Sequence, residues 1–271
     1  MLEHIQLVDL IQISQKAGDE IVKVYESDFS VETKEDDSPI TLADQKSHDV
    51  ISRGLKQLYP DIPILSEEGR DMPFETRKSW QSFWLVDPLD GTKEFVKRNG
   101  EFTTNIALIQ DGKPVLGVIY APMLACMYVA KKGEGSFKIS DVKNKSFSDD
   151  TTVLNEAVKL PATQNQDQHT VIASRSHMSE ETEQYVAQLK KEHQNVQLLS
   201  AGSSLKLCLV AEGKADVYPR FAPTMEWDTA AGQAIVEQSG GVVYMADENQ
   251  PLDYNKQNLR NPWFIAKRAL N

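Results

Sequence analysis

The stretch Trp84-Leu85-Val86-Asp87-Pro88-Leu89-Asp90-Gly91-Thr92 decides the interpretation of this chain. An apolar strand ends here in two carboxylates three residues apart, followed by a glycine and a hydroxyl group. Pro88 fixes its own φ and ends regular ladder pairing, and Gly91 lets the backbone approach a ligand closely. Both carboxylates can therefore converge on one point, as the oxygen ligands of Mg²⁺ do. An ordinary turn is the alternative, because Asp-Pro and Asp-Gly are common turn dipeptides.

Two further acids occupy similar positions. Glu67 follows a short apolar strand at 62–65, and Asp228 stands at the start of a helix, after Glu226-Trp227. Taken singly, Glu67 is explained as a solvated loop acid and Asp228 as an N-cap. Taken together with the two aspartates, they favour a shared site. Several carboxylates can hold two divalent ions around a phosphoryl group, so phosphate ester hydrolysis is the leading chemistry.

Composition limits the classes of protein to consider. The chain has 271 residues, 40% hydrophobic and 25% charged, which is typical of a soluble globular protein. Its net charge of -11 argues against binding to nucleic acid polymers or to an anionic membrane surface. Cys126 and Cys208 are too few and too far apart for a disulfide framework or a zinc site, so we expect buried thiols in a reducing cytosol. The first residues lack the pattern of a signal peptide, and the apolar stretch 115–130 is too short and too broken to span a membrane. We therefore expect a cytoplasmic protein.

The hydrophobic pattern predicts an α/β protein of two lobes in one compact unit. Residues 1–150 would form an α+β lobe with most of the acidic site, and residues 151–271 an α/β lobe. The polar stretch 140–169 is interpreted as a boundary made of long surface loops. We expect helices over 7–25 and 44–58 and from about 179, 203 and 228, and strands over 62–65, 83–86, 105–109, 115–120, 127–130, 135–139, 171–173 and 196–199.

Three segments in this order resemble the inositol monophosphatase superfamily of magnesium-dependent, lithium-sensitive phosphatases: Leu65-Ser66-Glu67-Glu68, Trp84 to Thr92, and Glu226-Trp227-Asp228-Thr229-Ala230-Ala231. Further strings resemble its bacterial 3'(2'),5'-bisphosphate nucleotidase branch: Ser38 to Asp44, Asp90 to Phe95, Ser174-Arg175-Ser176-His177 and Gly202-Ser203-Ser204-Leu205-Lys206. The likeness covers nearly the whole chain, and the polar stretch at about 138–168 is its least similar part. It implies a layered α-β-α-β-α sandwich and removal of the 3'-phosphate of adenosine 3',5'-bisphosphate, a by-product of sulfate assimilation, to give AMP.

The resemblance also implies roles for individual residues. The predicted ligands of two or three Mg²⁺ ions are Glu67, Asp87, the carbonyl of Leu89, Asp90 and Asp228. The segment Leu89 to Thr92 would receive the scissile phosphate. Thr92 and Asp44, with Glu67 beside them, would orient and deprotonate the attacking water. Asp44 is also explained as a first-turn acid favoured by the helix dipole.

Substrate selection depends on positions in the second half of the chain. Arg220 stands where the inositol-selective branch has a glutamate, so it could pair with a second phosphate; a surface arginine is the alternative. Gly202, Ser203 and Ser204 offer amide and hydroxyl groups to an anion or ribose, with Lys206 nearby, although an N-cap explains Ser203 as well. His177 is a candidate contact to adenine, or else an exposed or capping histidine.

The expected partner is a small nucleotide bisphosphate. The rival interpretations are an inositol-1-phosphate or broad sugar phosphatase of the same superfamily and, less well supported, a regulatory binding protein on this fold. The sequence does not decide whether the protein is a monomer or a homodimer. It also does not decide whether the protein docks on the inner face of the membrane, as is proposed for some relatives.

Overall fold

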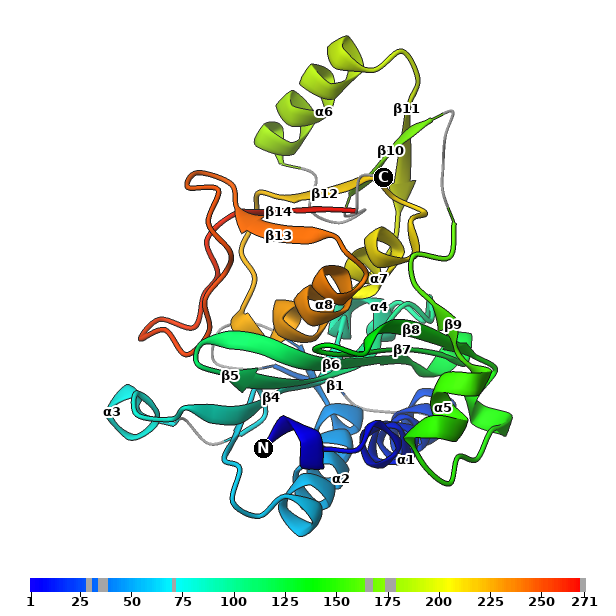
Figure 1. Ribbon diagram of the computed structural model, residues 1–271, viewed down its shortest axis with the longest axis vertical. Coiled ribbons are helices and arrows are strands. Elements are labelled where there is room, and N and C mark those ends of the chain that lie inside the picture. Colours follow the sequence, from blue (N-terminus) through cyan, green and yellow to red (C-terminus); the bar gives the residue numbers. More distant parts are fainter. Residues whose placement is uncertain (28–30, 34–38, 70–71, 164–167, 174–178, 269–271) are drawn as a thin grey trace.

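The computed structural model describes residues 1–27, 31–33, 39–69, 72–163, 168–173 and 179–268, and these form five stacked layers (Figure 1). Two helices cover a seven-stranded sheet, two more lie between it and a five-stranded sheet, and one helix covers the far side. The α-helices are α1 (Leu7–Tyr25), α2 (Leu42–Leu58), α3 (Phe74–Arg77), α4 (Thr92–Val96), α5 (Asp150–Glu156), α6 (Glu180–Glu192), α7 (Leu205–Glu212) and α8 (Glu226–Gln238). The α-β-α-β-α order confirms the predicted fold class.

The larger sheet carries the first half of the chain. Its strands follow one another in sequence order, and only β3 and β4 run parallel to each other. They are β3 (Ile64–Ser66), β4 (Ser82–Asp90), β5 (Thr103–Gln110), β6 (Lys113–Ala121), β7 (Cys126–Lys131), β8 (Gly135–Ser140) and β9 (Val158–Lys159). The central strands β4 to β7 are buried almost throughout, because helices cover both faces of the sheet. This explains their continuous apolar runs.

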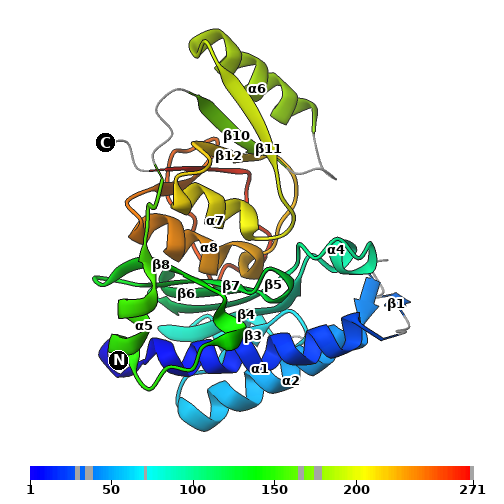
Figure 2. The same cartoon turned by 90° about the vertical axis from the view of Figure 1, so that its right-hand side faces the viewer.

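Helices α1 and α2 pack side by side on the outer face of this sheet (Figure 2). The buried positions of α1 recur at spacings of three and four residues, as the sequence predicts for an amphipathic helix. The antiparallel pair β1 (Val31–Thr33) and β2 (Pro39–Thr41) connects the two helices. Because β2 runs directly into α2, Asp44 lies in the first turn of that helix.

Helix α8 lies in the middle of the molecule, between the two sheets (Figure 1). It packs on β5, β6 and β7 and against α7, and most of its residues are buried on all sides. The backbones approach closely where a Cβ at Gly117 would collide with the backbone of Ala231, so only glycine fits at this point of β6. The hydrophobic core here combines residues of both halves of the chain.

The second sheet has the strand order β11-β10-β12-β14-β13, with a parallel part and an antiparallel edge. Its strands are β10 (His169–Ala173), β11 (Val196–Ser200), β12 (Val217–Arg220), β13 (Val242–Met245) and β14 (Phe264–Lys267). Helix α6 covers the face opposite α7 and α8 (Figure 1). The sequence pattern did not indicate β12, β13 and β14.

The polar stretch 140–169 differs from its expectation. It contains the 3-10 turn η3 (Val142–Asn144), helix α5 and strand β9, where long surface loops were predicted. Asp149 caps α5 and receives the amide of Thr152 at 2.8 Å, which explains how a polar segment forms a helix. The chain leaves the first sheet only after β9, and the division at residue 150 stays a prediction. Two more 3-10 turns are η1 (Leu2–His4) and η2 (Pro122–Leu124).

Two smaller expectations concern the cysteines and the membrane. Cys126 and Cys208 are free and buried, as predicted. Within the described ranges, no helix combines the length and the apolar character needed to cross a bilayer.

Candidate active site

The parallel pair β3 and β4 brings Glu67 beside Asp87. The amide of Glu67 donates to the carbonyl of Val86 at 3.1 Å, continuing the ladder by one residue. Carboxyl ends of parallel strands meet at the same sheet edge, so both acids lie at that edge. Asp87 is only 1% exposed. Two acids separated by 20 positions in the sequence therefore share one end of the sheet.

Strand β4 bends between Asp87 and Asp90. The register with β5 shifts there, and two hydrogen bonds hold the bend: the amide of Leu89 donates to Asp87 Oδ1 at 3.0 Å, and Ser47 Oγ donates to the carbonyl of Pro88 at 2.8 Å. Gly91 follows with φ of 90°, a conformation that glycine adopts at little cost, and α4 begins at the next residue. These two hydrogen bonds fix the conformation of the bend. An ordinary exposed turn, the alternative for this segment, would not need them.

Asp228 enters from helix α8. The helix begins at Glu226, so Asp228 lies in the first turn and not at the N-cap; its Oδ2 accepts from the amide of Met225 at 2.9 Å. Oxygen atoms of Asp87, Asp90 and Asp228 lie within 4.8 Å of one another. The hydrogen bond at the helix start and a role in the cluster are compatible, because a carboxylate has two oxygen atoms that can each accept more than one contact.

The electrostatics of this cluster favour a cation. Burial, followed by the negative charges of Glu67, Asp90, Asp228 and Asp44, holds the pKa of Asp87 well above its usual value. Burial and Asp90 likewise raise the pKa of Asp228. Neighbouring carboxylates destabilise one another unless a proton or a cation offsets the repulsion. Since every donor is an oxygen, the residues present fit a hard cation such as Mg²⁺.

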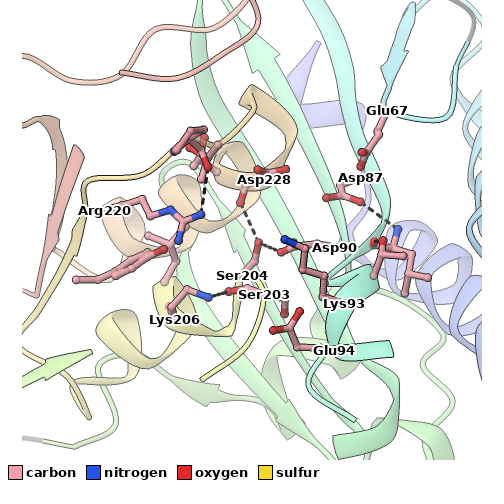
Figure 3. A pocket seen from close by; sticks show the side chains of 18 of the residues that line it. Glu67, Asp87, Asp90, Lys93, Glu94, Ser203, Ser204, Lys206, Arg220 and Asp228 are labelled. Carbon is pink, nitrogen blue, oxygen red and sulfur yellow. Dashed lines mark hydrogen bonds between the residues drawn. The ribbon is translucent and has the colours of Figure 1, made fainter. Parts of the chain in front are cut away.

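Positive side chains lie across the pocket from these acids (Figure 3). Lys206, in the first turn of α7, donates from Nζ to the carbonyls of Ser203 at 2.6 Å and Ala201 at 3.3 Å. Burial lowers the pKa of Lys206 to about 8, with Arg220 acting in the same direction and Asp90 against it. Arg220, at the end of β12, donates from Nη2 to the carbonyl of Pro223 at 3.1 Å. The site therefore combines a place for cations with a place for anions.

One cavity of about 350 Å³ unites most of the predicted site. The cavity is larger than a single phosphate needs, and it extends from the acidic cluster to Arg220. The predicted residues that line it are Glu67, Asp87, Leu89, Asp90, Gly91, Thr92, Ser203, Ser204, Lys206, Arg220 and Asp228.

Of the predicted residues that the structure describes, Gly202 and Asp44 do not line this cavity. The amide of Gly202 donates to Glu101 Oε2 at 2.8 Å, so the expected free N–H group is already used. Asp44 is 1% exposed and acts on the cluster through its charge on Asp87. His177 lies outside the described residues. The N-cap alternative for Ser203 is wrong, because Ser204 is the N-cap of α7 and Ser203 has a φ of 42°.

The pair Thr92 and Asp44 stays a prediction. Thr92 lines the cavity and donates its hydroxyl to the carbonyl of Leu89 at 3.4 Å. Asp44 contributes to the negative field on Asp87 from the start of α2. Both residues therefore lie near the acidic cluster, each on a different element.

Sequence reasoning missed other residues of the site. Lys93, Glu94, Tyr218 and Thr224 line the cavity without having been singled out for it. Tyr218 lies beside Lys206, whose Nζ is 5.7 Å from the ring centroid. Lys93 and Glu94 directly follow the motif at Thr92, so their position was a usable signal. Tyr218 required knowledge of β12, which the sequence pattern did not indicate.

Comparison with known proteins supports the same interpretation. The 3'(2'),5'-bisphosphate nucleotidase CysQ of Salmonella typhimurium is 48% identical over 262 residues, covering 95% of this chain and 98% of the relative. The Escherichia coli K12 protein of the same name is 47% identical with the same coverage. The crystal structure of CysQ from Bacteroides thetaiotaomicron, described as a bacterial member of the inositol monophosphatase family, matches with a TM-score of 0.89 at 48% identity, covering 97% of each chain. The suhB protein of Bartonella henselae matches with a TM-score of 0.72 at 26% identity, covering 96% of this chain and 92% of that one.

The family model agrees with these relatives over almost the full length. It describes the inositol monophosphatase family and matches residues 2–267, a range that includes the acidic cluster, the bend after Asp87 and the first turn of α8. This chain therefore belongs to the inositol monophosphatase family.

Proposed function

We propose that this protein is a Mg²⁺-dependent 3'(2'),5'-bisphosphate nucleotidase that hydrolyses the 3'-phosphate of adenosine 3',5'-bisphosphate to AMP and phosphate. The observation that carries the proposal is the single cavity in which an acidic cluster faces Lys206 and Arg220. A substrate with two phosphates needs one place where phosphate reacts and another where phosphate is only bound. The full-length relatives named above support the same substrate.

Mg²⁺ ions would be held by the side chains of Glu67, Asp87, Asp90 and Asp228 and by the carbonyl of Leu89. When bound, the cations polarise the phosphoryl group and make a nearby water molecule more acidic. The chain itself supplies the oxygen ligands and holds them in place through the bend of β4 and the first turn of α8. The acids are kept together at an energetic cost that a proton or a cation offsets, and the number of carboxylates supports two or three ions at this site.

The substrate would be bound by the segments that meet in the cavity. The residues Leu89 to Thr92, at the start of α4, would receive the scissile phosphate. Arg220 would pair with the second phosphate through its planar guanidinium group, which matches phosphate oxygens. Lys206 has two of its three N–H groups on carbonyls, which leaves one donor for an anion or a ribose hydroxyl.

The attacking water would be oriented by Thr92 and Asp44, with Glu67 beside them. Asp44 is buried in the first turn of α2, and its charge is felt at Asp87. A carboxylate in this position can accept a proton that passes through the threonine hydroxyl. This assignment rests on the residue types and on their closeness to the acidic cluster.

The deciding experiment is a phosphate-release assay on adenosine 3',5'-bisphosphate, AMP and inositol-1-phosphate. We expect hydrolysis of the bisphosphate only with Mg²⁺, inhibition by added Li⁺ as in the lithium-sensitive family, and little release from AMP. Faster turnover of inositol-1-phosphate than of the bisphosphate would favour a sugar phosphatase. No release from any of the three with Mg²⁺ would leave a binding protein on this fold.

A further inference from the structure

Two buried polar side chains on the same face of β5, Thr103 and Asn105, make hydrogen bonds toward the acidic cluster. Thr103 is 0% exposed and Asn105 is 1% exposed, in a strand that is otherwise mainly apolar. In the register of the sheet, Thr103 lies opposite Asp90, and Asn105 lies opposite Asp87. Burying an amide and a hydroxyl group costs free energy unless they are hydrogen bonded, so their partners explain their presence.

Their hydrogen bonds form a chain that ends on Asp90. Thr103 Oγ1 donates to Asn105 Oδ1 at 3.0 Å and also lies 3.3 Å from Ser203 Oγ. Asn105 Nδ2 donates to Ser204 Oγ at 2.9 Å. Ser204 Oγ donates in turn to Asp90 Oδ2 at 2.6 Å and lies 2.8 Å from the carbonyl of Asp228. Asn105 Nδ2 also lies 3.5 Å from Asp90 Oδ2. We call these three residues, Thr103, Asn105 and Ser204, the relay.

The direction of the relay follows from the chemistry of its groups. An amide can present either its oxygen or its nitrogen, and a hydroxyl group pairs with both. The Asp90 carboxylate only accepts, and because its Oδ2 lies 3.5 Å from Asn105 Nδ2 it places the nitrogen on its side, which leaves the oxygen to accept from Thr103. The amide nitrogen of Asn105 therefore faces Ser204, whose hydroxyl accepts from it and is free to give its one hydrogen to Asp90. A donor aimed at a carboxylate stabilises the charged form, which is the form that binds a cation.

The relay also joins separate elements. Asp90 ends β4, Ser204 is the N-cap of α7, and the carbonyl of Asp228 lies in the first turn of α8. Figure 3 shows Ser204 between Asp90 and Asp228, with Lys206 on the same segment as Ser204. The Ser204 hydroxyl thus lies within hydrogen-bond distance of both elements that carry these two acids, Asp90 and Asp228, and it caps the helix that carries Lys206.

We propose that Asn105, oriented by Thr103 and acting through Ser204, is a positioning residue that fixes the Asp90 carboxylate for divalent cation binding. Oδ2 of Asp90 is held by the relay, which leaves Oδ1 for the cation. This inference rests on the proposed function, since it concerns the cation site assigned there. It assigns to Ser204 a role in holding Asp90, separate from any contact with substrate.

The strand offers a matched control. Thr104 neighbours Thr103, is equally buried at 0% exposed, and its hydroxyl has no hydrogen-bond partner among the described residues. Adjacent residues of a strand face opposite sides of the sheet, so Thr104 points away from the relay. Thr103→Val and Thr104→Val make the same chemical change in the same strand, one inside the relay and one outside it.

The test is a calorimetric Mg²⁺ titration of the parent protein, Thr103→Val, Thr103→Ser and Thr104→Val, without substrate. Loss of a group that orients a metal ligand typically weakens metal binding about 10- to 100-fold, and we expect this loss for Thr103→Val. Thr103→Ser keeps the hydroxyl and should bind as the parent does, and Thr104→Val should also be unchanged. At saturating Mg²⁺, Thr103→Val should recover most of its kcat.

A double-mutant cycle tests the chain of contacts. Ser204→Ala removes the hydroxyl that reaches Asp90 and should weaken Mg²⁺ binding at least as much as Thr103→Val. Because both changes break one chain, the double variant should be scarcely weaker than Ser204→Ala alone. Parent-like Mg²⁺ affinity in Thr103→Val, equal losses in Thr103→Val and Thr104→Val, or losses that multiply in the double variant would overturn the relay. If the parent protein binds no Mg²⁺, the proposed function fails, and the relay fails with it.

Discussion

Asp87→Asn tests the acidic cluster most directly. Asp87 is buried, and four other acids act on it, so its charged form is unfavourable without a cation. Asparagine has the same shape without the charge. The variant should fold, lose its response to Mg²⁺ and lose activity.

The sign of the stability change follows from the raised pKa of Asp87. The folded state keeps a proton that the unfolded chain has already released, so the metal-free parent loses stability as pH rises from the unfolded pKa towards the folded one. Asparagine has no proton to lose. At pH 7 without metal, Asp87→Asn should therefore be at least as stable as the parent.

Bound Mg²⁺ should make the parent more stable than Asp87→Asn. A ligand present at about 100 times its Kd stabilises the folded state by about 2.7 kcal/mol. For chains of 150–250 residues, 1 kcal/mol shifts Tm by about 2–4 °C, so Mg²⁺ should raise Tm of the parent by about 5–10 °C. Asp87→Asn should show a small part of that shift. Because residues that only support a metal ligand already cost about 10- to 100-fold, loss of a ligand itself should lower kcat/KM by at least about 10².

The measurement is a pair of thermal unfolding curves, with and without Mg²⁺, beside the phosphate-release assay. Asp61→Asn is the matched control, because Asp61 is exposed in a loop and the chemical change is the same. It should keep both the Mg²⁺ shift and the activity. Equal Mg²⁺ shifts in Asp87→Asn and the parent, with activity retained, would refute the assignment of Asp87 as a metal ligand.

Three further predictions concern the substrate side and the attacking water. Arg220→Ala should lower kcat/KM for the bisphosphate by about 10- to 100-fold, as expected for one charge-assisted contact, and barely change it for inositol-1-phosphate; equal losses on both would contradict a role in reading the second phosphate. Because burial lowers the pKa of Lys206 to about 8, kcat/KM should fall as this cation is lost above that pH, and Lys206→Arg should move the fall to higher pH; an unchanged profile would exclude Lys206 from binding the anion. Thr92→Val and Asp44→Asn should each lower kcat by about 10² to 10⁴ with little change in KM, and the double variant should be scarcely worse; near-normal kcat in Thr92→Val would remove the pair from the mechanism.

The acidic cluster could be predicted from the sequence because its members mark the ends of regular elements. Asp87 and Glu67 follow apolar strands, and Asp228 follows Glu226-Trp227 at a helix start, so each is visible as a break in a hydrophobic pattern. The layered fold was predicted from a resemblance that covers nearly the whole chain. The helices over 7–25 and 44–58 were close to their observed bounds because their apolar faces repeat with helical spacing.

The relay and the anion side were not predictable in the same way. In the sequence, Thr103 and Asn105 are only polar residues within a strand. The register of the sheet shows that they lie opposite Asp90 and Asp87. Register depends on contacts between strands, which a single sequence does not specify by local pattern. The hydrogen bond from the amide of Gly202 to Glu101 could not be predicted for the same reason, because it joins segments about 100 positions apart. Helix α5 was missed because capping by Asp149 forms it within a polar stretch.

The charges around the cavity predict that cation and substrate bind together. The described lining includes five acids and three basic side chains, so the cavity resembles the whole chain in being acidic when all of them are ionised. Without a cation, protons on Asp87 and Asp228 would lower this negative charge, but the cavity would still offer little positive charge to a bisphosphate beyond Lys206 and Arg220. Two divalent cations add four positive charges and reverse the local sign. If Mg²⁺ supplies these charges, it should bind before the substrate or together with it, and the loss in Asp87→Asn should appear in substrate affinity as well as in kcat.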